Sequence, residues 1–310
     1  MKLPRRNRVY QCHHFDSTRW NYLKHRDDDI VIATSYKAGT TWTQGIVANL
    51  LFPDGNFPAP PEALSPWLDM RLIPLELVLG GLDAQQNRRF MKTHLPLDGM
   101  RYETNVKYLY VTRDGRDVFM SLWNHYRHMT PEFIMSLNAM PGRVGPEFPQ
   151  APEDIHEFWS GWVSKNLLEN EVGGWPFWSH LSNVQSWWEF RQLPNIRLVH
   201  YNDLLADIES EMRGIADFLD IDVPEAAWPG IVEAVSFSEM KARGDLYVPG
   251  GGVFWKGGTE TFMNKGVNGR WAEVLTDEEL AQYEVACEQA LSPDCREWLA
   301  NGGSLPEEKK

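Results

Sequence analysis

Apolar positions along the chain form four short, nearly continuous runs, separated by longer stretches of mixed polarity. The runs are rich in β-branched and aromatic residues, and they predict strands over residues 30–34, 89–93, 106–112 and 196–201. The first run, Ile30-Val31-Ile32-Ala33-Thr34, is continuous instead of alternating. Such a run is typical of a strand that is buried on both faces of a parallel sheet.

Between and after these runs, apolar residues recur at helical spacing. The spacing predicts helices over residues 43–51, 117–128, 207–219 and 276–291, and Thr276-Asp277-Glu278-Glu279 begins the last helix with a capping box. Strands that alternate with helices indicate an α/β fold with a central, mainly parallel sheet covered by helices on both faces. We expect a single domain over residues 1–310, although this length also allows two.

Three stretches lack this regularity and are rich in proline or glycine. They cover residues 53–87, 129–153 and 241–270. Long irregular segments in a compact domain are often lids or binding loops. The alternative for each stretch is a solvated connection without a function.

Composition and net charge argue against several classes of protein. A net charge of −13 argues against general nucleic-acid binding, so any anion site has to be local. No run of about eighteen apolar residues occurs, and no apolar segment follows the charged N-terminus, which predicts neither a membrane span nor a signal peptide. Three cysteines suit a reducing compartment such as the cytoplasm. Cys12-His13-His14 has no matching second cluster, so we expect no metal site.

The turn after the first strand has the composition of an anion site. Its sequence is Ser35-Tyr36-Lys37-Ala38-Gly39-Thr40-Thr41-Trp42. Free backbone N–H groups and the helix dipole converge where a strand leads into a helix. Gly39 lets the backbone approach a phosphate, and Lys37 supplies a positive charge. Thr40 and Thr41 add hydroxyl donors. The alternative is an ordinary turn with a surface lysine.

The second strand ends in Lys92-Thr93-His94-Leu95-Pro96. Because ligands of open α/β sheets bind beyond the carboxyl ends of the strands, His94 is placed to face the site. A neutral imidazole can take a proton from a substrate hydroxyl, so His94 is a candidate general base, with Lys92 beside it. The alternative is a hydrogen-bonded structural histidine.

Two further positions suit a second phosphate. Arg113 ends the third strand, and Ser121 follows about two helical turns later. Arg113 can bind a phosphate with two hydrogen bonds, or it can form a surface ion pair with Asp114 or Asp117. The glycine-rich segment 262–266 can close over the same phosphate or remain a solvated loop. Trp42, next to the turn, can stack on an adenine ring.

Together, these motifs resemble those of the cytosolic sulfotransferase family, in the same order and across most of the chain. Residues 36–42 are similar to the loop that binds the 5′-phosphosulfate of the co-substrate, with Ala38 in place of serine. Lys92-Thr93-His94 is similar to the strand end that carries the family's catalytic histidine. Arg113 with Ser121 matches its pair for the 3′-phosphate.

Later segments extend the resemblance. Residues 235–240 are similar to the family's adenine-side segment, and residues 262–266 with Gly269 and Trp271 are similar to its closing loop. Asn264 stands where the family usually has arginine, which removes one positive charge near the 3′-phosphate. The resemblance implies that the co-substrate is bound by Lys37, Ala38, Gly39, Thr40, Thr41, Trp42, Arg113, Ser121, Tyr201, Val235, Phe237, Met240, Phe262, Met263, Asn264, Lys265 and Gly266.

The resemblance also implies a reaction. A sulfuryl group passes from 3′-phosphoadenosine 5′-phosphosulfate (PAPS) to a hydroxyl, with His94 as base and Lys37 and Lys92 as electrostatic catalysts, and no metal is expected. It further implies that Ser121 holds Lys37 away from the co-substrate until the acceptor binds. Aromatic and apolar residues in segments 53–87 and 129–153 favour a small, apolar alcohol or phenol as acceptor. The oligomeric state is left open.

Two other functions fit the same arrangement of strands and helices. One is a P-loop kinase or related nucleoside-triphosphate enzyme, but the usual signature has lysine directly after its second glycine, whereas Lys37 precedes Gly39. The other is a nucleotide-binding module without catalytic activity.

Overall fold

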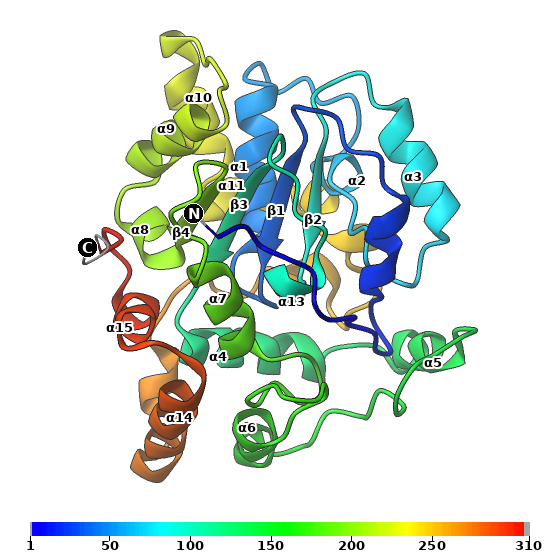
Figure 1. The fold of residues 1–310 in the computed structure, drawn as a ribbon, viewed down its shortest axis with the longest axis vertical. Helices are drawn as coiled ribbons and strands as arrows, with labels where there is room; N and C mark the ends of the chain where they lie inside the picture. The colour runs from blue at the N-terminus through cyan, green and yellow to red at the C-terminus, as the bar shows by residue number, and fades with distance from the viewer. Residues whose placement is uncertain (1, 307–310) are drawn as a thin grey trace.

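A four-stranded parallel sheet forms the centre of the computed structural model, which describes residues 2–306 (Figure 1). The strand order is β2-β1-β3-β4, and every pairing is parallel. The strands agree with the four predicted runs to within a residue at either end. They are β1 (Ile30–Thr34), β2 (Phe90–Thr93), β3 (Lys107–Thr112) and β4 (Ile196–His200).

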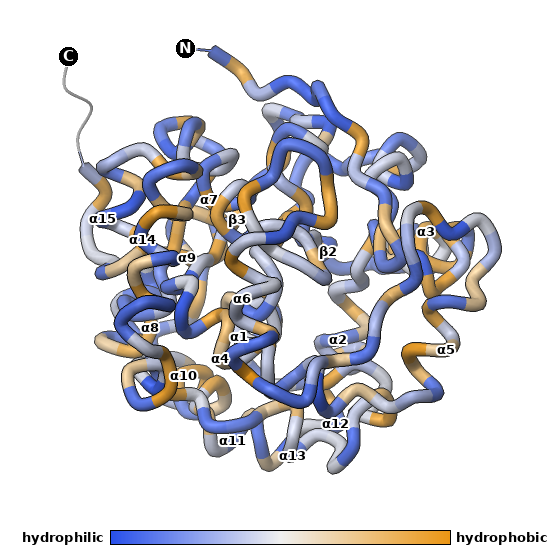
Figure 2. Tube along the Cα trace, turned by 90° about the horizontal axis from the view of Figure 1, so that it is seen from below, coloured by the Kyte–Doolittle hydropathy of each residue, from blue (hydrophilic) through white to orange (hydrophobic). Residues whose placement is uncertain are grey.

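Helices cover the sheet on both faces, as predicted. The four predicted helices are present as α1, α4, α9 and α14, and the capping box at Thr276 is formed. Figure 2 places α8, α9 and α10 on one side of the molecule and α3 and α5 on the opposite side. The helices are α1 (Thr40–Leu51), α2 (Pro61–Leu64), α3 (Leu75–Ala84), α4 (Gly115–Arg127), α5 (Pro131–Ala139), α6 (Ile155–Ser164), α7 (His180–Trp188), α8 (Tyr201–Ala206), α9 (Ile208–Phe218), α10 (Trp228–Ala234), α11 (Phe237–Ala242), α12 (Gly244–Tyr247), α13 (Gly258–Phe262), α14 (Asp277–Ala290) and α15 (Pro293–Asn301).

Side chains of β1 alternate between two apolar cores, one on each face of the sheet. Val31 and Ala33 belong to the larger core, together with side chains of α4, α6, α7, α14 and α15. Ile30 and Ile32 belong to the second core, together with side chains of α1, α9 and α10. Successive strand residues point to opposite faces, so burial on both faces requires the continuous apolar run seen in the sequence.

The three irregular stretches contain short helices, which corrects the sequence interpretation. Segment 53–87 holds α2 and α3, segment 129–153 holds α5, and segment 241–270 holds α12 and α13. Pro61 and Pro131 lie in the first turns of their helices, and Pro74 is the residue before α3. Proline at a helix start removes no intrahelical hydrogen bond, so these prolines begin helices instead of breaking them.

Three strands, β2, β3 and β4, are each one residue shorter than predicted. Tyr201 begins α8 instead of ending β4, because His200 caps that helix by accepting a hydrogen bond from the backbone N–H of Asn202 at 3.1 Å. Arg89 precedes β2, and its side chain is buried in a pair with Asp29, which directly precedes β1. The Asp29–Arg89 pair therefore fixes the starts of two neighbouring strands.

The Asp29–Arg89 pair generates a stability prediction. Arg89 donates to both carboxylate oxygens of Asp29, at 2.8 and 2.7 Å. Arg89→Ala should lower the free energy of unfolding by about 3–5 kcal/mol in urea titrations, because it leaves a buried carboxylate without its partner. The control Arg296→Ala breaks an exposed pair with Glu288 and should cost less than about 1 kcal/mol. Equal losses in the two variants would contradict this prediction.

The Asp29–Arg89 pair also makes the stability of the folded state depend on pH. Burial by itself raises the pKa of Asp29, but hydrogen bonds from His25, Arg89 and the Arg26 backbone outweigh it and hold the pKa below its usual value. A depressed pKa in the folded state contributes stability above the unfolded value of about 4, which is lost as pH falls through the folded value. Arg89→Ala should flatten the wild-type loss of stability in acid.

Candidate active site

A cavity of about 880 Å³ opens beyond the carboxyl ends of β1, β2 and β3. It is bounded by α1, α4 and the segments 53–87 and 241–270. Every site residue predicted from the sequence lines this cavity except Ala38, which is fully buried and can offer only its backbone. The parallel sheet brings together Lys37, His94 and Arg113, as expected for residues that follow strands ending at one edge, and helices α11 and α13 with their connections add residues 235–266.

The turn after β1 is shaped for an anion. Lys37 has a φ of 64° and Gly39 a φ of 114°, so the chain passes twice through left-handed conformations before α1 begins at Thr40. A Cβ at Gly39 would lie 3.1 Å from the ring of Tyr201. No side chain caps α1, which leaves its first N–H groups available to a bound anion. Thr40 Oγ1 is already 2.6 Å from Thr34 Oγ1, whereas Thr41 shows no such bond within residues 2–306.

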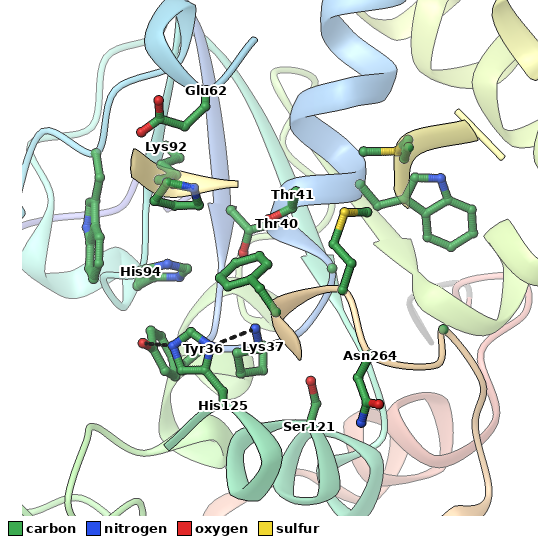
Figure 3. A pocket seen from close by; sticks show the side chains of 18 of the residues that line it. Tyr36, Lys37, Thr40, Thr41, Glu62, Lys92, His94, Ser121, His125 and Asn264 are labelled. Carbon is green, nitrogen blue, oxygen red and sulfur yellow. Dashed lines mark hydrogen bonds between the residues drawn. The ribbon is translucent and has the colours of Figure 1, made fainter. Parts of the chain in front are cut away.

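Lys37 projects into the cavity and is held by a histidine that the sequence did not single out. Its Nζ lies 3.2 Å from Nδ1 of His125 and 4.2 Å from the ring centre of Phe262 (Figure 3). Nε2 of His125 lies 2.8 Å from the hydroxyl of Tyr36. An ammonium group only donates, so a charged Lys37 requires His125 to accept at Nδ1 and to donate from Nε2 to the Tyr36 oxygen.

Ser121 also comes from α4, but it has no hydrogen bond to Lys37 among the described residues. The family resemblance assigns Ser121 the task of holding Lys37, whereas here the ammonium group contacts His125. Figure 3 shows the Ser121 side chain pointing toward the cavity, with the dashed line from Lys37 running to His125. His125 lies four residues after Ser121, one helical turn further along α4.

His94 has one ring nitrogen fixed and the other free. Its Nδ1 lies 3.0 Å from both the carbonyl oxygen and the hydroxyl of Thr34. A carbonyl only accepts, so Nδ1 carries the proton and Nε2 carries a lone pair. Nε2 has no hydrogen-bond partner within the described chain. The backbone is held in turn, because Asn183 of α7 donates to the His94 carbonyl at 2.8 Å.

Electrostatics keep His94 neutral. Burial lowers the pKa of His94 to about 3, and the charges of Lys92 and Lys37 contribute to this shift. Burial likewise lowers the pKa of Lys92 to about 8, although Glu62 and Asp69 oppose the shift. Figure 3 shows Glu62 beside Lys92. His94 is thus a neutral acceptor over the physiological pH range, with its lone pair available to a hydroxyl proton.

Arg113 is bound to the glycine-rich loop and not to a surface acid. Its side chain is buried, stacks over the ring of Tyr201 at 4.4 Å, and donates to the carbonyl of Val267 at 3.0 Å. Asp114 pairs with Arg116, whereas Asp117 forms an ion pair with Arg113 at 3.9 Å, and both of these side chains are buried. The ion pair considered from the sequence is therefore present with Asp117, but it is buried and does not lie on the surface.

The opposite wall gathers the predicted adenine-side residues. Trp42 donates from Nε1 to the Val235 carbonyl at 2.9 Å, and its ring is edge-on to Tyr201 at 5.1 Å. A Cβ at Gly266 would lie 2.6 Å from the Phe237 ring, and Gly266 has a φ of 66°, so both space and backbone conformation require glycine. The other residues on this wall are Met240, Met263, Asn264 and Lys265.

Sequence reasoning missed several polar residues of the cavity. They are His14, Glu62, His125, Glu233 and Arg270. His14 was considered only as a metal ligand, yet its Nδ1 lies 2.7 Å from Nδ1 of His13, and Nε2 of His13 contacts the Pro176 carbonyl at 3.0 Å. Among the described residues, no group of three or more His, Cys, Asp or Glu side chains could hold a metal ion.

Comparison with known proteins assigns the family. The family model of the sulfotransferase domain matches residues 27–294 of this chain. This range includes the Lys37 turn, His94, His125 and the glycine-rich segment 262–266. A glycolipid sulfotransferase of Mycobacterium bovis is 31% identical, covering 95% of this chain and 94% of the relative. This chain belongs to the sulfotransferase family and is a transferase, which sets aside the kinase alternative.

More distant relatives agree with this assignment. Human sulfotransferase 1E1 is 29% identical, covering 81% of this chain and 79% of the relative. Mouse sulfotransferase SULT7A1, solved in complex with PAP, superposes with a TM-score of 0.68 at 20% identity and covers 91% of both chains. Retinol dehydratase, solved with retinol and PAP, gives a TM-score of 0.66 at 23% identity. The two structures support the fold of this chain.

Within residues 2–306, every helix is too short or too polar to cross a bilayer.

Burial of Lys37 leads to a prediction about its charge. Burial lowers the pKa of Lys37 to about 7, with contributions from the charges of Arg113 and Lys92. In ¹³C NMR titrations of lysine-labelled protein, the signal that disappears in Lys37→Arg should titrate near pH 7, while exposed lysines titrate near their usual value of about 10. A midpoint above about pH 9 for this signal would contradict the enclosed position of Lys37.

Proposed function

We propose that this chain transfers a sulfuryl group from PAPS to the hydroxyl of a small apolar alcohol or phenol. The observation that carries the proposal is the free Nε2 lone pair of His94, which shares one cavity with the Lys37 turn. A proton acceptor and an anion-binding turn are the two components that an in-line transfer to a hydroxyl needs. The PAP named in the structures of two fold relatives supports the choice of donor.

The roles of the residues follow from their positions. Nε2 of His94 accepts the proton of the acceptor hydroxyl, whose oxygen forms a bond to sulfur while the bond from sulfur to the 5′-phosphate oxygen breaks. Lys37 and the N–H groups of the turn stabilise the charge that develops on the departing oxygen, with Lys92 as a second cation. Lys37 must leave His125 to do so, and a bound polyanion raises the pKa of Lys37 and holds it charged.

Nucleotide binding is assigned to the remaining part of the cavity. Trp42 and Tyr201 offer aromatic surfaces, and Arg113 with Ser121 offers donors for the 3′-phosphate. The remaining contacts expected from the family resemblance come from Val235, Phe237, Met240, Phe262, Met263, Asn264, Lys265 and Gly266, all of which line the same cavity. We therefore propose that the donor lies between Lys37 and Arg113.

The acceptor is assigned to the apolar part of the cavity next to His94. Side chains of segments 53–87 and 241–270 line this part together with Phe133 of α5, including Trp67, Met70, Leu72, Val78 and Phe254. The irregular segments are therefore proposed as acceptor-binding walls. The relative that acts on a glycolipid supports an acceptor that combines a hydroxyl with apolar groups.

We also propose a cytoplasmic location. All three cysteines, Cys12, Cys287 and Cys295, are buried free thiols. Burial raises the pKa of Cys12 and Cys287 to about 12, which keeps these thiols protonated and unreactive. Free thiols are typical of proteins in a reducing compartment.

If His94 is the general base, its removal should lower turnover without weakening nucleotide binding. His94→Ala should reduce turnover by about 10²–10⁴-fold with any accepted phenol, because it removes the proton acceptor, and should leave the Kd for 3′,5′-adenosine bisphosphate nearly unchanged. His156→Ala, which removes a more exposed imidazole on α6, is the matched control. Near-normal turnover of His94→Ala would refute the assignment.

The nucleotide that the protein prefers to bind tests whether PAPS is the sulfuryl donor. In a thermal-shift titration without an acceptor, 3′,5′-adenosine bisphosphate should raise the Tm without any divalent cation, because ligands that bind only the folded state stabilise it. The shift and the turnover should be unaffected by EDTA. A shift with ATP and magnesium alone would overturn the proposed donor. Tight bisphosphate binding without turnover across a broad panel of acceptors would favour a noncatalytic module.

A further inference from the structure

Arg270 is a cavity residue whose charge has no partner. It lines the cavity, directly after the glycine-rich loop, and its Nε is buried without a hydrogen bond. Within residues 2–306, its guanidinium forms neither an ion pair nor a hydrogen bond. By contrast, the buried Arg89 is paired with Asp29 at 2.7 Å. The Arg270 side chain is only partly buried, but its enclosed Nε and the absence of a partner within the described chain leave hydrogen-bond donors that an anionic ligand in the cavity can satisfy.

A second guanidinium lies on the same loop as Arg270. Arg113 donates to Asn268 at 2.7 Å and to the Val267 carbonyl at 3.0 Å, two and three residues before Arg270, and both arginines line the cavity. Burial lowers the pKa of Arg113 and the charge of Arg270 adds to this, although Tyr201 and Asp117 oppose the shift. Neither local acid pairs with Arg270, because Asp114 is bonded to Arg116, and Asp117 pairs with Arg113 at 3.9 Å and accepts from the backbone N–H of Gly269 at 2.8 Å. One carboxylate thus stands against the two guanidinium groups of Arg113 and Arg270. Two neighbouring cations repel each other unless an anion lies between them.

The loop before Arg270 holds this arrangement in place. Asn268 accepts hydrogen bonds from Arg113 and donates to Oδ1 of Asn202 at 2.5 Å. Gly269, with a φ of 82°, is tied to Asp117 on the first turn of α4. The backbone next to Arg270 is therefore anchored to the ends of β3 and β4, and the same helix α4 presents Ser121 to the cavity.

We propose that Arg270 is a nucleotide-binding residue whose guanidinium, together with that of Arg113, binds the ribose 3′-phosphate of the donor. The proposal rests on the function proposed above and adds a residue to it. A doubly charged phosphate suits two guanidinium groups, each of which can donate two parallel hydrogen bonds. Asn264 also lines the cavity, but its side chain is uncharged. Arg270 therefore supplies a positive charge that the residue at position 264 lacks.

Two nucleotides that differ only in the 3′-phosphate isolate this role. We would measure the Kd of 3′,5′-adenosine bisphosphate and of adenosine 5′-monophosphate by calorimetry for the wild type, Arg270→Ala, Arg270→Lys and the surface control Arg296→Ala. Arg270→Ala should weaken the bisphosphate about 10- to 100-fold, the usual effect of losing hydrogen bonds between charged groups. The monophosphate should change less than about threefold, and Arg270→Lys should fall between wild type and Arg270→Ala.

The outcomes separate this proposal from the proposed function. A wild type that prefers the bisphosphate and an Arg270→Ala variant that keeps the full preference would overturn the role of Arg270 and leave the function intact. Equal weakening of both nucleotides would also overturn it, because the effect would then not concern the 3′-phosphate. A wild type without any preference for the bisphosphate would overturn both. The Arg270 side chain forms no hydrogen bond or ion pair with another described residue. Arg270→Ala should therefore keep the wild-type Tm, which serves as the folding control.

Discussion

Parallel pairing of β1 between β2 and β3 is the constraint on which the rest of the structure depends. The pairing places Ala33 beside both Thr93 and Tyr110, and so brings three strand ends to one edge of the sheet. The Lys37 turn, His94 and Arg113 follow directly from these three ends. Residues that are dozens of positions apart in the sequence therefore share one cavity without any special long-range interaction.

Neutral histidines and enclosed cations give this cavity its chemical character. Burial keeps His94 and His125 uncharged, and hydrogen bonds to fixed carbonyl or hydroxyl groups determine which ring nitrogen carries the proton. Burial disfavours the charged forms of Lys37 and Lys92 and so lowers the pKa of each ammonium group. A bound polyanion favours the charged forms, so ligand binding and the protonation of the two lysines are coupled at this site.

The parts of the fold that could be predicted are those with a local sequence signal. Continuous apolar runs identified the strands, and Gly39 with Lys37 identified the turn. Helix α7 was missed because the polar residues His180 and Asn183 are buried in it and obscure the helical pattern. Asn183 accepts a hydrogen bond from the Tyr110 hydroxyl at 2.8 Å. The roles of His125 and Arg270 depend on contacts across the fold, which no local spacing encodes.

The cavity concentrates positive charge inside a protein whose net charge is −13. An anionic donor in solution therefore meets a repulsive field before it reaches Lys37 and Arg113. Dissolved salt screens exposed charges separated by more than about 8 Å far more than it screens enclosed pairs. Added salt should therefore speed the approach of the anionic donor to the acidic protein more than it weakens the contacts between the donor and the enclosed cations.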